Sequence, residues 1–369
     1  MNFEFIIFNS NLTHQILISL PMMVCLFWGI YFLIRLFRPE PERRVTATLV
    51  LFYAAATVLY LDHWLYFSGV VHVWGEWSYG IVNLLVYPLY YTYLRALTRA
   101  NRVGRELIAL FSFALPGVVL FPIGRYTALL SDAQTFLIIR LCFALQVVWV
   151  LVRGYQLLRH TIRRMDNTYS DDRSRLLRPT HNLLILFGIT SAASMILNVL
   201  GREFFTHEAS VSLPAVVMSV LLYGLGFVAA HTTLPAETVS EETAEESLPA
   251  TDKEETSELI HRIDTIMREQ LLYTNAGLTI QDLAGAVGSN RTYVSNAINR
   301  TYGISFSQYV SRQRIAYAQL ILKDPRYRTD KAAVSDAISL SGFASDQTFY
   351  RVFKDLTGQT PLQYRKAKG

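Results

Sequence analysis

Hydrophobic residues follow two different patterns along this chain of 369 residues. Before residue 236 they form long continuous runs, whereas after residue 258 they recur every three or four positions. A bilayer core about 30 Å thick requires about 20 apolar residues in a helix that rises about 1.5 Å per residue. Seven runs reach or approach this length, at residues 16–37, 45–67, 77–97, 107–123, 133–152, 181–200 and 211–230. The first pattern therefore predicts a bundle of seven transmembrane helices in residues 1–235.

The placement of arginine predicts how these helices are oriented. Cytoplasmic loops of membrane proteins carry an excess of Arg and Lys. Fifteen arginines lie in the segments 35–44, 95–105 and 153–178, which all fall on one side of the bundle, and two, Arg125 and Arg202, lie on the other side. We therefore expect the N-terminus outside the membrane and all residues after the seventh span in the cytoplasm.

Composition divides the chain in the same way. Hydrophobic residues make up 51% of the chain and charged residues 17%, against about 25% charged in a typical soluble domain. The net charge of +5 combines +6 in residues 1–235, −8 in residues 236–258 and +7 in residues 259–369. Residues 236–258 are rich in Glu, Thr and Ser and contain no aromatic residue, which is typical of a flexible linker. The two cysteines, Cys25 and Cys142, give no disulfide framework and no CxxC spacing.

Polar residues within the predicted spans are candidates for sensing, because polar groups are costly inside a membrane. Five of them share one depth, in the outer part of the bundle: Asp62, His63, Asn83, Arg140 and Asn198. One interpretation is that Asp62 pairs with Arg140 and holds the bundle together. The other is a pocket for a small molecule or an ion that opens to the outer face. The spacing of His residues does not indicate a metal site.

The last segment, residues 259–369, has the spacing of short amphipathic helices. The predicted helices cover residues 257–271, 280–287, 291–302, 306–322, 333–340, 346–357 and 362–368. Candidate N-caps are Thr279, Ser289 or Asn290, and Ser345. Gly288 and Gly342 mark short turns between paired helices. A helix, a short turn and a second helix form the helix-turn-helix pattern, and this segment contains the pattern twice.

This segment resembles the DNA-binding domain of the AraC/XylS family of bacterial transcription factors. The resemblance covers about residues 259–367 and is most specific in two stretches. GF-x-S-x-Q-x-F-x-R-x-F-K runs from Gly342 to Lys354, and TP-x-x-YR runs from Thr360 to Arg365. The resulting fold class is all-α, with seven transmembrane helices followed by a cytoplasmic AraC-type domain of two helix-turn-helix units. Fusion to seven spans resembles a minority group of membrane-bound family members.

The second helix of each unit carries a polar face that suits the major groove. The resemblance implies that DNA contacts come from Arg291, Thr292, Ser295, Asn296 and Arg300 in the first unit and from Asp346, Gln347, Tyr350, Arg351 and Lys354 in the second. Asn296, Gln347 and Arg351 are the expected base readers, because amides pair with adenine and guanidinium with guanine. Asp346 departs from the uncharged or amide residue expected at its position; it could read cytosine, cap the helix or weaken affinity.

Other basic residues of this segment suit contacts with phosphates, which give affinity without sequence information. The candidates are Arg312, Arg314, Arg326, Arg328, Lys331 and Lys354.

No catalytic constellation is present in the sequence. GxGxxG, the P-loop, HExxH and GxSxG motifs are all missing, and the acidic residues Asp166, Asp171 and Asp172 are interpreted as part of a solvated cytoplasmic loop. We expect no enzyme activity, no cofactor and no metal.

The function expected from these features is a one-component transcription regulator in the bacterial cytoplasmic membrane that couples a signal sensed by the seven spans to gene expression. Its expected partners are double-stranded DNA, membrane lipid, RNA polymerase, a small-molecule or envelope signal, and a second copy of the chain in a homodimer. Two alternatives stay open. One is a transporter or membrane enzyme with an autoregulatory DNA-binding tail. The other is a membrane anchor with a protein-binding tail.

Overall fold

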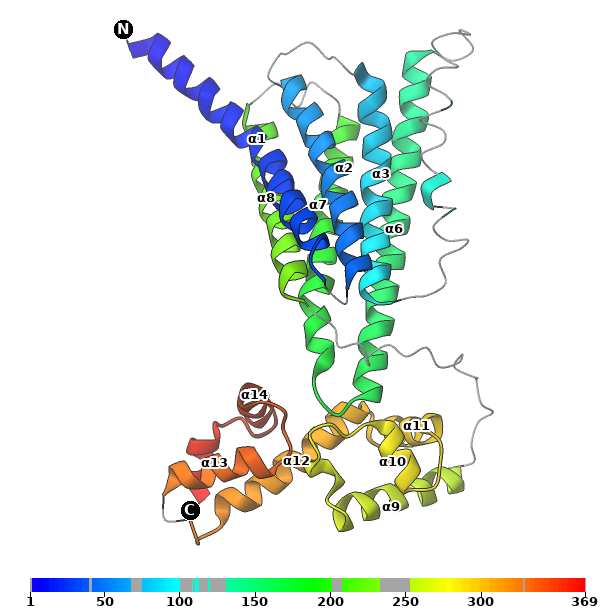
Figure 1. Ribbon diagram of the computed structural model, residues 1–369, viewed down its shortest axis with the longest axis vertical. Coiled ribbons are helices and arrows are strands. Elements are labelled where there is room, and N and C mark those ends of the chain that lie inside the picture. Colours follow the sequence, from blue (N-terminus) through cyan, green and yellow to red (C-terminus); the bar gives the residue numbers. More distant parts are fainter. Residues whose placement is uncertain are drawn as a thin grey trace. The chain divides into compact units, whose positions relative to one another are not determined.

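The computed structural model describes residues 2–39, 42–67, 75–99, 131–200, 208–232, 253–327 and 329–368, with isolated residues at 108, 110–112 and 119. The described residues form helices and one isolated antiparallel bridge (Figure 1). They divide into two compact units. The first contains residues 1–159 and 176–239, and the second contains residues 160–175 and 240–369.

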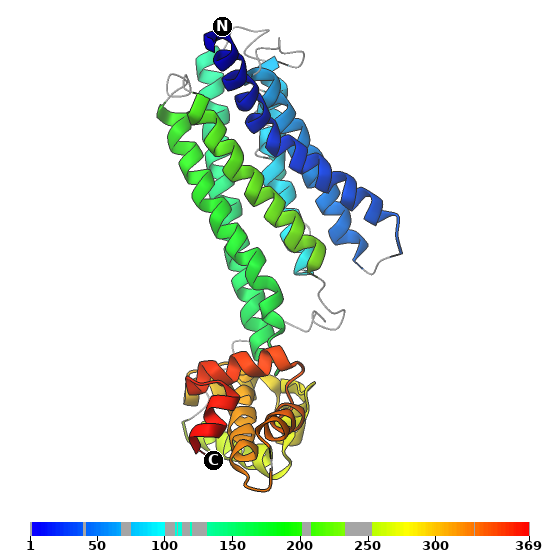
Figure 2. The ribbon, with the colours of Figure 1, turned by 90° about the vertical axis from the view of Figure 1, so that its left-hand side faces the viewer.

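The first unit is a bundle of long helices that run side by side (Figures 1 and 2). Its helices are α1 (Asn2–Leu36), α2 (Arg43–Phe67), α3 (Gly75–Leu97), α6 (Asp132–Thr168, of which the last residues belong to the second unit), α7 (Arg178–Leu200) and α8 (Glu208–His231). Large apolar side chains cover its outside; Phe27, Leu145 and Ile189 are each more than half exposed. Such an exterior is typical of a surface that contacts lipid or another apolar partner.

Four helices of the described residues are long and apolar enough to cross a membrane. These candidate spans are Leu12–Leu36, Arg43–Leu65, Arg140–Thr168 and Val211–His231. The all-helical prediction is therefore confirmed for the described residues, while the prediction of seven spans is supported at four positions. The helices α3 and α7 lie where the third and sixth spans are expected, but they are not among the four. The expected fourth span, 107–123, lies almost entirely outside the described residues.

Close packing joins α1 to α2 and α8. A Cβ atom on Gly226 of α8 would overlap the ring of Trp28 in α1, so only glycine lets these helices approach so closely. Tyr53 of α2 donates a hydrogen bond of 2.8 Å to the carbonyl of Leu222 in α8. In α6, the fully buried Gln146 donates to the carbonyls of Leu84 and Leu110. Tyr53 and Gln146 thus each donate to backbone carbonyls of other segments.

The second unit is built from helices that pack along α12 (Figure 1). Its elements are η1 (Arg173–Leu177, of which the last two residues belong to the first unit), α9 (Lys253–Glu269), η4 (Leu272–Thr274), α10 (Ile280–Ala286), α11 (Arg291–Tyr302), α12 (Phe306–Lys323), α13 (Asp330–Leu340), α14 (Asp346–Thr357) and α15 (Pro361–Lys368). Two hydrophobic cores form along α12. Phe306 and Val310 lie in the first core, with α9 to α11, and Ala318 and Leu322 lie in the second, with α13 and α14.

Local signals in the sequence set the ends of these helices. Thr279 caps α10 in a capping box with Asp282, and Asn290, rather than Ser289, caps α11. Ser345 caps α14 as expected. The helix α9 begins at Lys253, within the stretch 236–258 that we expected to be linker. Residues 236–252 lie outside the described residues.

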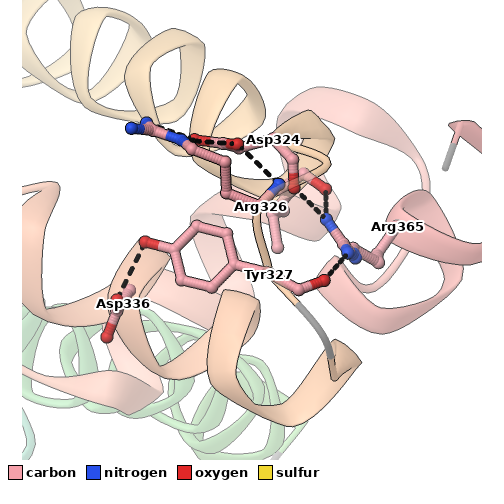
Figure 3. A network of polar contacts seen from close by, with 6 residues as sticks. Asp324, Arg326, Tyr327, Asp336 and Arg365 are labelled. Atoms are coloured by element: carbon pink, nitrogen blue, oxygen red, sulfur yellow. Dashed lines mark hydrogen bonds and ion pairs between the residues drawn. The ribbon is translucent and has the colours of Figure 1, made fainter.

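A network of polar contacts closes the C-terminal end of the second unit (Figure 3). Arg365 of α15 donates hydrogen bonds to the carbonyls of Leu322, Asp324 and Tyr327 at 2.6, 3.0 and 3.0 Å. Its side chain is 11% exposed and also pairs with Asp330. These carbonyls lie at the end of α12 and in the turn that follows it, so Arg365 fixes the path of the chain from α12 to α13.

Candidate nucleic-acid interface

The first recognition-type helix, α11, presents a polar face opposite a buried one. Val294, Ala297 and Ile298 are buried in the first core. Asn296 and Arg300 are exposed, and the other predicted contacts of this helix, Arg291, Thr292 and Ser295, are half-buried. Ser295 accepts a hydrogen bond of 3.3 Å from Asn299. The expected base reader Asn296 is therefore accessible.

The second recognition-type helix, α14, has the same arrangement. Phe349 and Phe353 are fully buried, and both anchor α14 in the second core. The predicted contacts Asp346, Gln347, Tyr350 and Lys354 are exposed. Ser345, rather than Asp346, caps the helix, so capping does not account for the acid at Asp346.

Arg351, the third expected base reader, has its guanidinium engaged within the protein. Nη2 pairs with Asp172 at 2.5 Å, and Nη1 lies 3.4 Å from Asp355 on the same helix. Its Nε is buried and has no hydrogen-bond partner among the described residues. Guanine recognition uses two parallel N–H donors of one guanidinium. Arg351 in this arrangement is not free to supply them.

Arg314 does not suit the phosphate contact that we expected. It is 1% exposed, and its guanidinium donates to the carbonyls of Tyr273, Asn275 and Ser170 and to the hydroxyl of Ser170. The ring of Phe343 lies 5.5 Å from the guanidinium. Burial lowers the pKa of Arg314 to about 10, and the charge of Asp171 opposes that shift. Arg314 thus stays charged at neutral pH and joins the first helix-turn-helix unit to the second.

The sequence contains a pattern that indicates a buried position for Arg314. Val310, Arg314 and Ala318 are spaced by four residues on α12, and all three are buried. Residues at this spacing share one face of a helix, so the apolar neighbours indicate a buried position.

The remaining phosphate candidates have different environments. Arg312, Lys331 and Lys354 are exposed. Arg326 is 88% exposed and pairs with Asp324 (Figure 3), and this pair lowers the pKa of Asp324 to about 2, mainly through the hydrogen bonds from Arg326. Arg328 lies outside the described residues.

A loop that we interpreted as solvated lies within the second unit. Residues 160–175, which include Asp171 and Asp172, pack with the C-terminal helices. Ser170 is 2% exposed and its amide donates to the carbonyl of Leu278, while Tyr169 forms an antiparallel bridge with Thr279. The sequence pattern does not predict this contact. The available signal is the presence of Asp171 and Asp172 within the Arg-rich segment 153–178.

The predicted sensing residues are spread over four helices of the first unit. Asp62 and His63 on α2 and Asn83 on α3 are half-buried, and Arg140 on α6 is exposed. The side chain of Asn198 on α7 lies outside the described ones. His63 Nδ1 lies 3.1 Å from the carbonyl of Leu59, one turn earlier on its own helix. The sensing site stays a prediction. Within the described part of the chain, His, Cys, Asp and Glu form no group of three placed to hold a metal ion.

Comparisons with known proteins concern the second unit. A family model described as a helix-turn-helix domain matches residues 283–367. The melibiose operon regulatory protein of Escherichia coli K12 is 35% identical over 89 residues, which cover 24% of this chain and 28% of that protein. An uncharacterized HTH-type transcriptional regulator of Staphylococcus aureus MSSA476 is 33% identical over 94 residues, 26% of this chain and 12% of that protein.

These relatives are matched over less than a third of their own length. No solved structure matches the chain. The matches, together with the two helix-turn-helix units of the structure, identify the C-terminal segment as a helix-turn-helix domain.

Proposed function

We propose that this protein is a membrane-bound, one-component transcription regulator whose C-terminal domain binds double-stranded DNA in a sequence-specific manner. The observation that carries the proposal is the pair of helices α11 and α14. Each follows a short turn, buries an apolar face in its own core and exposes amide or basic side chains on the other face. Because the single helix α12 contributes to both cores, one domain presents two such helices to DNA.

The membrane part of the proposal rests on the first unit and on the arginine pattern. Seven spans cross the bacterial cytoplasmic membrane, with the N-terminus outside and the DNA-binding domain in the cytoplasm. The four candidate spans and the apolar exterior of the bundle support this arrangement. An external or membrane-soluble signal changes the packing of the spans and thereby the activity of the domain. RNA polymerase and a second copy of the chain are the proposed protein partners.

Selection of DNA by the intact protein tests this proposal. Full-length protein in lipid nanodiscs is incubated with fragmented genomic DNA, and the bound fragments are sequenced and footprinted. The expected result is a small set of enriched sites, each protected over two adjacent major grooves on one face of the duplex. Absence of any site preference at moderate salt contradicts sequence-specific binding. Substrate flux in vesicles by a protein that selects no DNA supports a transporter instead.

Two single substitutions separate base reading from phosphate binding. Gln347→Ala removes an amide placed for adenine, so it should relax preference at one base pair by about 1–3 kcal/mol. Lys354→Ala should weaken binding to all sequences alike and reduce the salt slope by about one unit. A uniform loss for both variants contradicts the assignment of Gln347 as a base reader.

The sensing half is tested with the expected pair in the bundle. Asp62→Asn and Arg140→Gln are compared in a reporter strain exposed to candidate extracellular compounds. Unchanged responses at normal protein levels contradict a pocket at these residues.

A further inference from the structure

The loop that joins α6 to α7 lies against the helix-turn-helix domain. The bridge between Tyr169 and Thr279 and the hydrogen bond from Ser170 to Leu278 attach it at the start of α10. Asp172, two residues after Ser170, forms an ion pair with Arg351 on α14. The loop therefore contacts both helix-turn-helix units, although 179 residues separate Asp172 from Arg351 in the sequence.

The loop holds Asp172 in a defined position. The hydroxyl of Ser174 donates to the carboxylate of Asp172 at 3.4 Å, and the amide of Arg175 donates to its carbonyl at 3.1 Å, at the start of η1. Ser174 is 1% exposed, and the side chain of Asp172 is 15% exposed. The carboxylate is thus shielded and fixed beside Arg351, in contrast to Asp355, which is 63% exposed. Shielded charge pairs are screened less by salt than exposed ones.

Arg314 attaches the loop a second time. Its guanidinium donates to the carbonyl of Ser170 at 3.3 Å and to the hydroxyl of Ser170 at 3.0 Å. Departure of the loop removes both acceptors from a buried charge, which is costly unless water replaces them. The docked loop is therefore a distinct state of the domain, with its own set of hydrogen bonds.

We propose that the loop from Tyr169 to Asp172 is an intramolecular competitor of DNA: it occupies Arg351 through Asp172, and its release frees α14 to read a base. The proposal rests on the proposed function, since it presupposes that α14 binds DNA. The loop is continuous with α6 and α7, two of the helices proposed to cross the membrane. A signal that moves these helices would then change DNA affinity without any covalent modification.

Paired substitutions test the competitor role. Asp172→Asn and Asp355→Asn each remove one negative charge beside Arg351, but only Asp172 belongs to the loop. Binding is measured with full-length protein in nanodiscs and a labelled duplex of the most enriched genomic site. We expect Asp172→Asn to raise affinity about tenfold, within the usual range of coupling between sites. Asp355→Asn should change it about twofold, as for an exposed pair on one helix. Equal changes in the two variants overturn the proposal.

A disulfide tests the same idea in the opposite direction. Residues opposite each other in an antiparallel pair have Cα atoms about 4.5–5.5 Å apart, which suits a disulfide. The double variant Tyr169→Cys, Thr279→Cys should bind DNA about tenfold more weakly when oxidised and recover on reduction. Thr279→Cys alone, treated in the same way, controls for the lost N-cap and for the natural Cys25 and Cys142.

The outcomes separate the two proposals. Oxidised and reduced double variants that bind DNA equally well overturn the competitor role and leave the proposed function standing. Failure of every form, including Asp172→Asn, to bind any duplex overturns the proposed function and the competitor role together.

Discussion

Two arginines, the buried Arg314 and the half-buried Arg365, hold the second unit together through backbone carbonyls. Arg314 contacts carbonyls of the segment that follows α9, and Arg365 contacts carbonyls at the end of α12 and in the turn after it. Carbonyls at helix ends lack partners within the helix. A guanidinium has several N–H donors in a fixed geometry, so one side chain satisfies two or three such carbonyls at once. This use of arginine depends on shape and hydrogen bonding more than on charge.

Replacement of Arg365 should destabilise the second unit. Arg365→Met keeps much of the side-chain volume but leaves the carbonyls of Leu322, Asp324 and Tyr327 without this donor. We expect a loss of about 2–4 kcal/mol in the free energy of unfolding. Pulse proteolysis of the full-length protein across a urea series measures the stability of this unit. Arg326→Met is the control, because Arg326 is 88% exposed and its ion pair lies at the surface, where such pairs contribute little to stability. Similar losses in the two variants contradict this reasoning.

At the scale of elements, α12 contributes side chains to both hydrophobic cores of the second unit. Gly342, in the turn before α14, lies close to the segment that follows α9. Its φ is +81°, and a Cβ atom there would lie 2.5 Å from the carbonyl oxygen of Thr274. Gly303, which ends α11, also has a positive φ of +67°, but it has open space around it. Gly303 is therefore needed only for the turn after α11. Gly342 is needed both for the turn before α14 and for the close contact with the segment after α9.

These two glycines give a matched pair of substitutions. Gly303→Ala should cost about 1 kcal/mol, because only the left-handed backbone conformation is penalised. Gly342→Ala should cost about 3 kcal/mol or more, since the added methyl also displaces the backbone at Thr274. The same urea-dependent proteolysis compares the two variants. Equal costs would mean that the turn at Gly342 moves away from the backbone of Thr274 at little cost in free energy.

The contact of α9 with α11 and α12 predicts a dependence on pH. Tyr302 and Tyr309 both donate to Asp264 of α9, at 2.5 and 2.6 Å. Burial and the neighbouring carboxylate raise the pKa of Tyr302 to about 12 and also raise that of Tyr309. Because these pKa values are raised in the folded state, the protonated hydroxyls stabilise the fold fully below pH 10, the ordinary pKa of tyrosine. This stabilisation is lost as the pH rises towards 12.

Thermal unfolding between pH 8 and 12 measures this effect. The melting temperature of the second unit should fall most steeply above pH 10. The variant Tyr302→Phe should show a shallower fall over the same range, because one of the two titrating hydroxyls is missing. A fall that begins near neutral pH, or an unchanged slope in the variant, argues against the role of Asp264.

The predictable elements are those set by neighbouring residues. The N-caps Thr279 and Ser345 and the turn at Gly342 act within a few positions of the helices that they define, so the sequence pattern contains them. The contact of Asp172 with Arg351 joins residues 179 positions apart. No local pattern encodes which acid meets which base at that distance, and polar side chains in a loop look alike whether they are solvated or docked. For the same reason, charge alone misassigned Arg314 to the surface.

At the scale of the whole molecule, the chain combines an apolar bundle with a polar, basic domain. The arginine pattern predicts that 95–105 faces the cytoplasm and that Arg125 and Arg202 face outward. The variants Arg102→Cys and Arg125→Cys, each in a background in which Cys25 and Cys142 are replaced by Ala, should differ in labelling. A membrane-impermeant maleimide added to intact cells with a permeable outer membrane should label the cysteine at 125, and the one at 102 only after lysis. The reverse pattern contradicts the proposed orientation.

The position of Asp172 on the same polypeptide as Arg351 has a consequence for regulation. A tethered group acts at an effective concentration set by chain geometry rather than by the number of molecules in the cell. DNA that binds α14 must therefore displace a competitor of constant strength. A higher copy number of the protein raises the amount bound to DNA, but it leaves unchanged the balance between docked and released loops in each unbound molecule. The sequence of the loop would therefore set how readily DNA displaces it, and substitutions in the loop would change this balance without altering α11, α14 or the helices of the bundle.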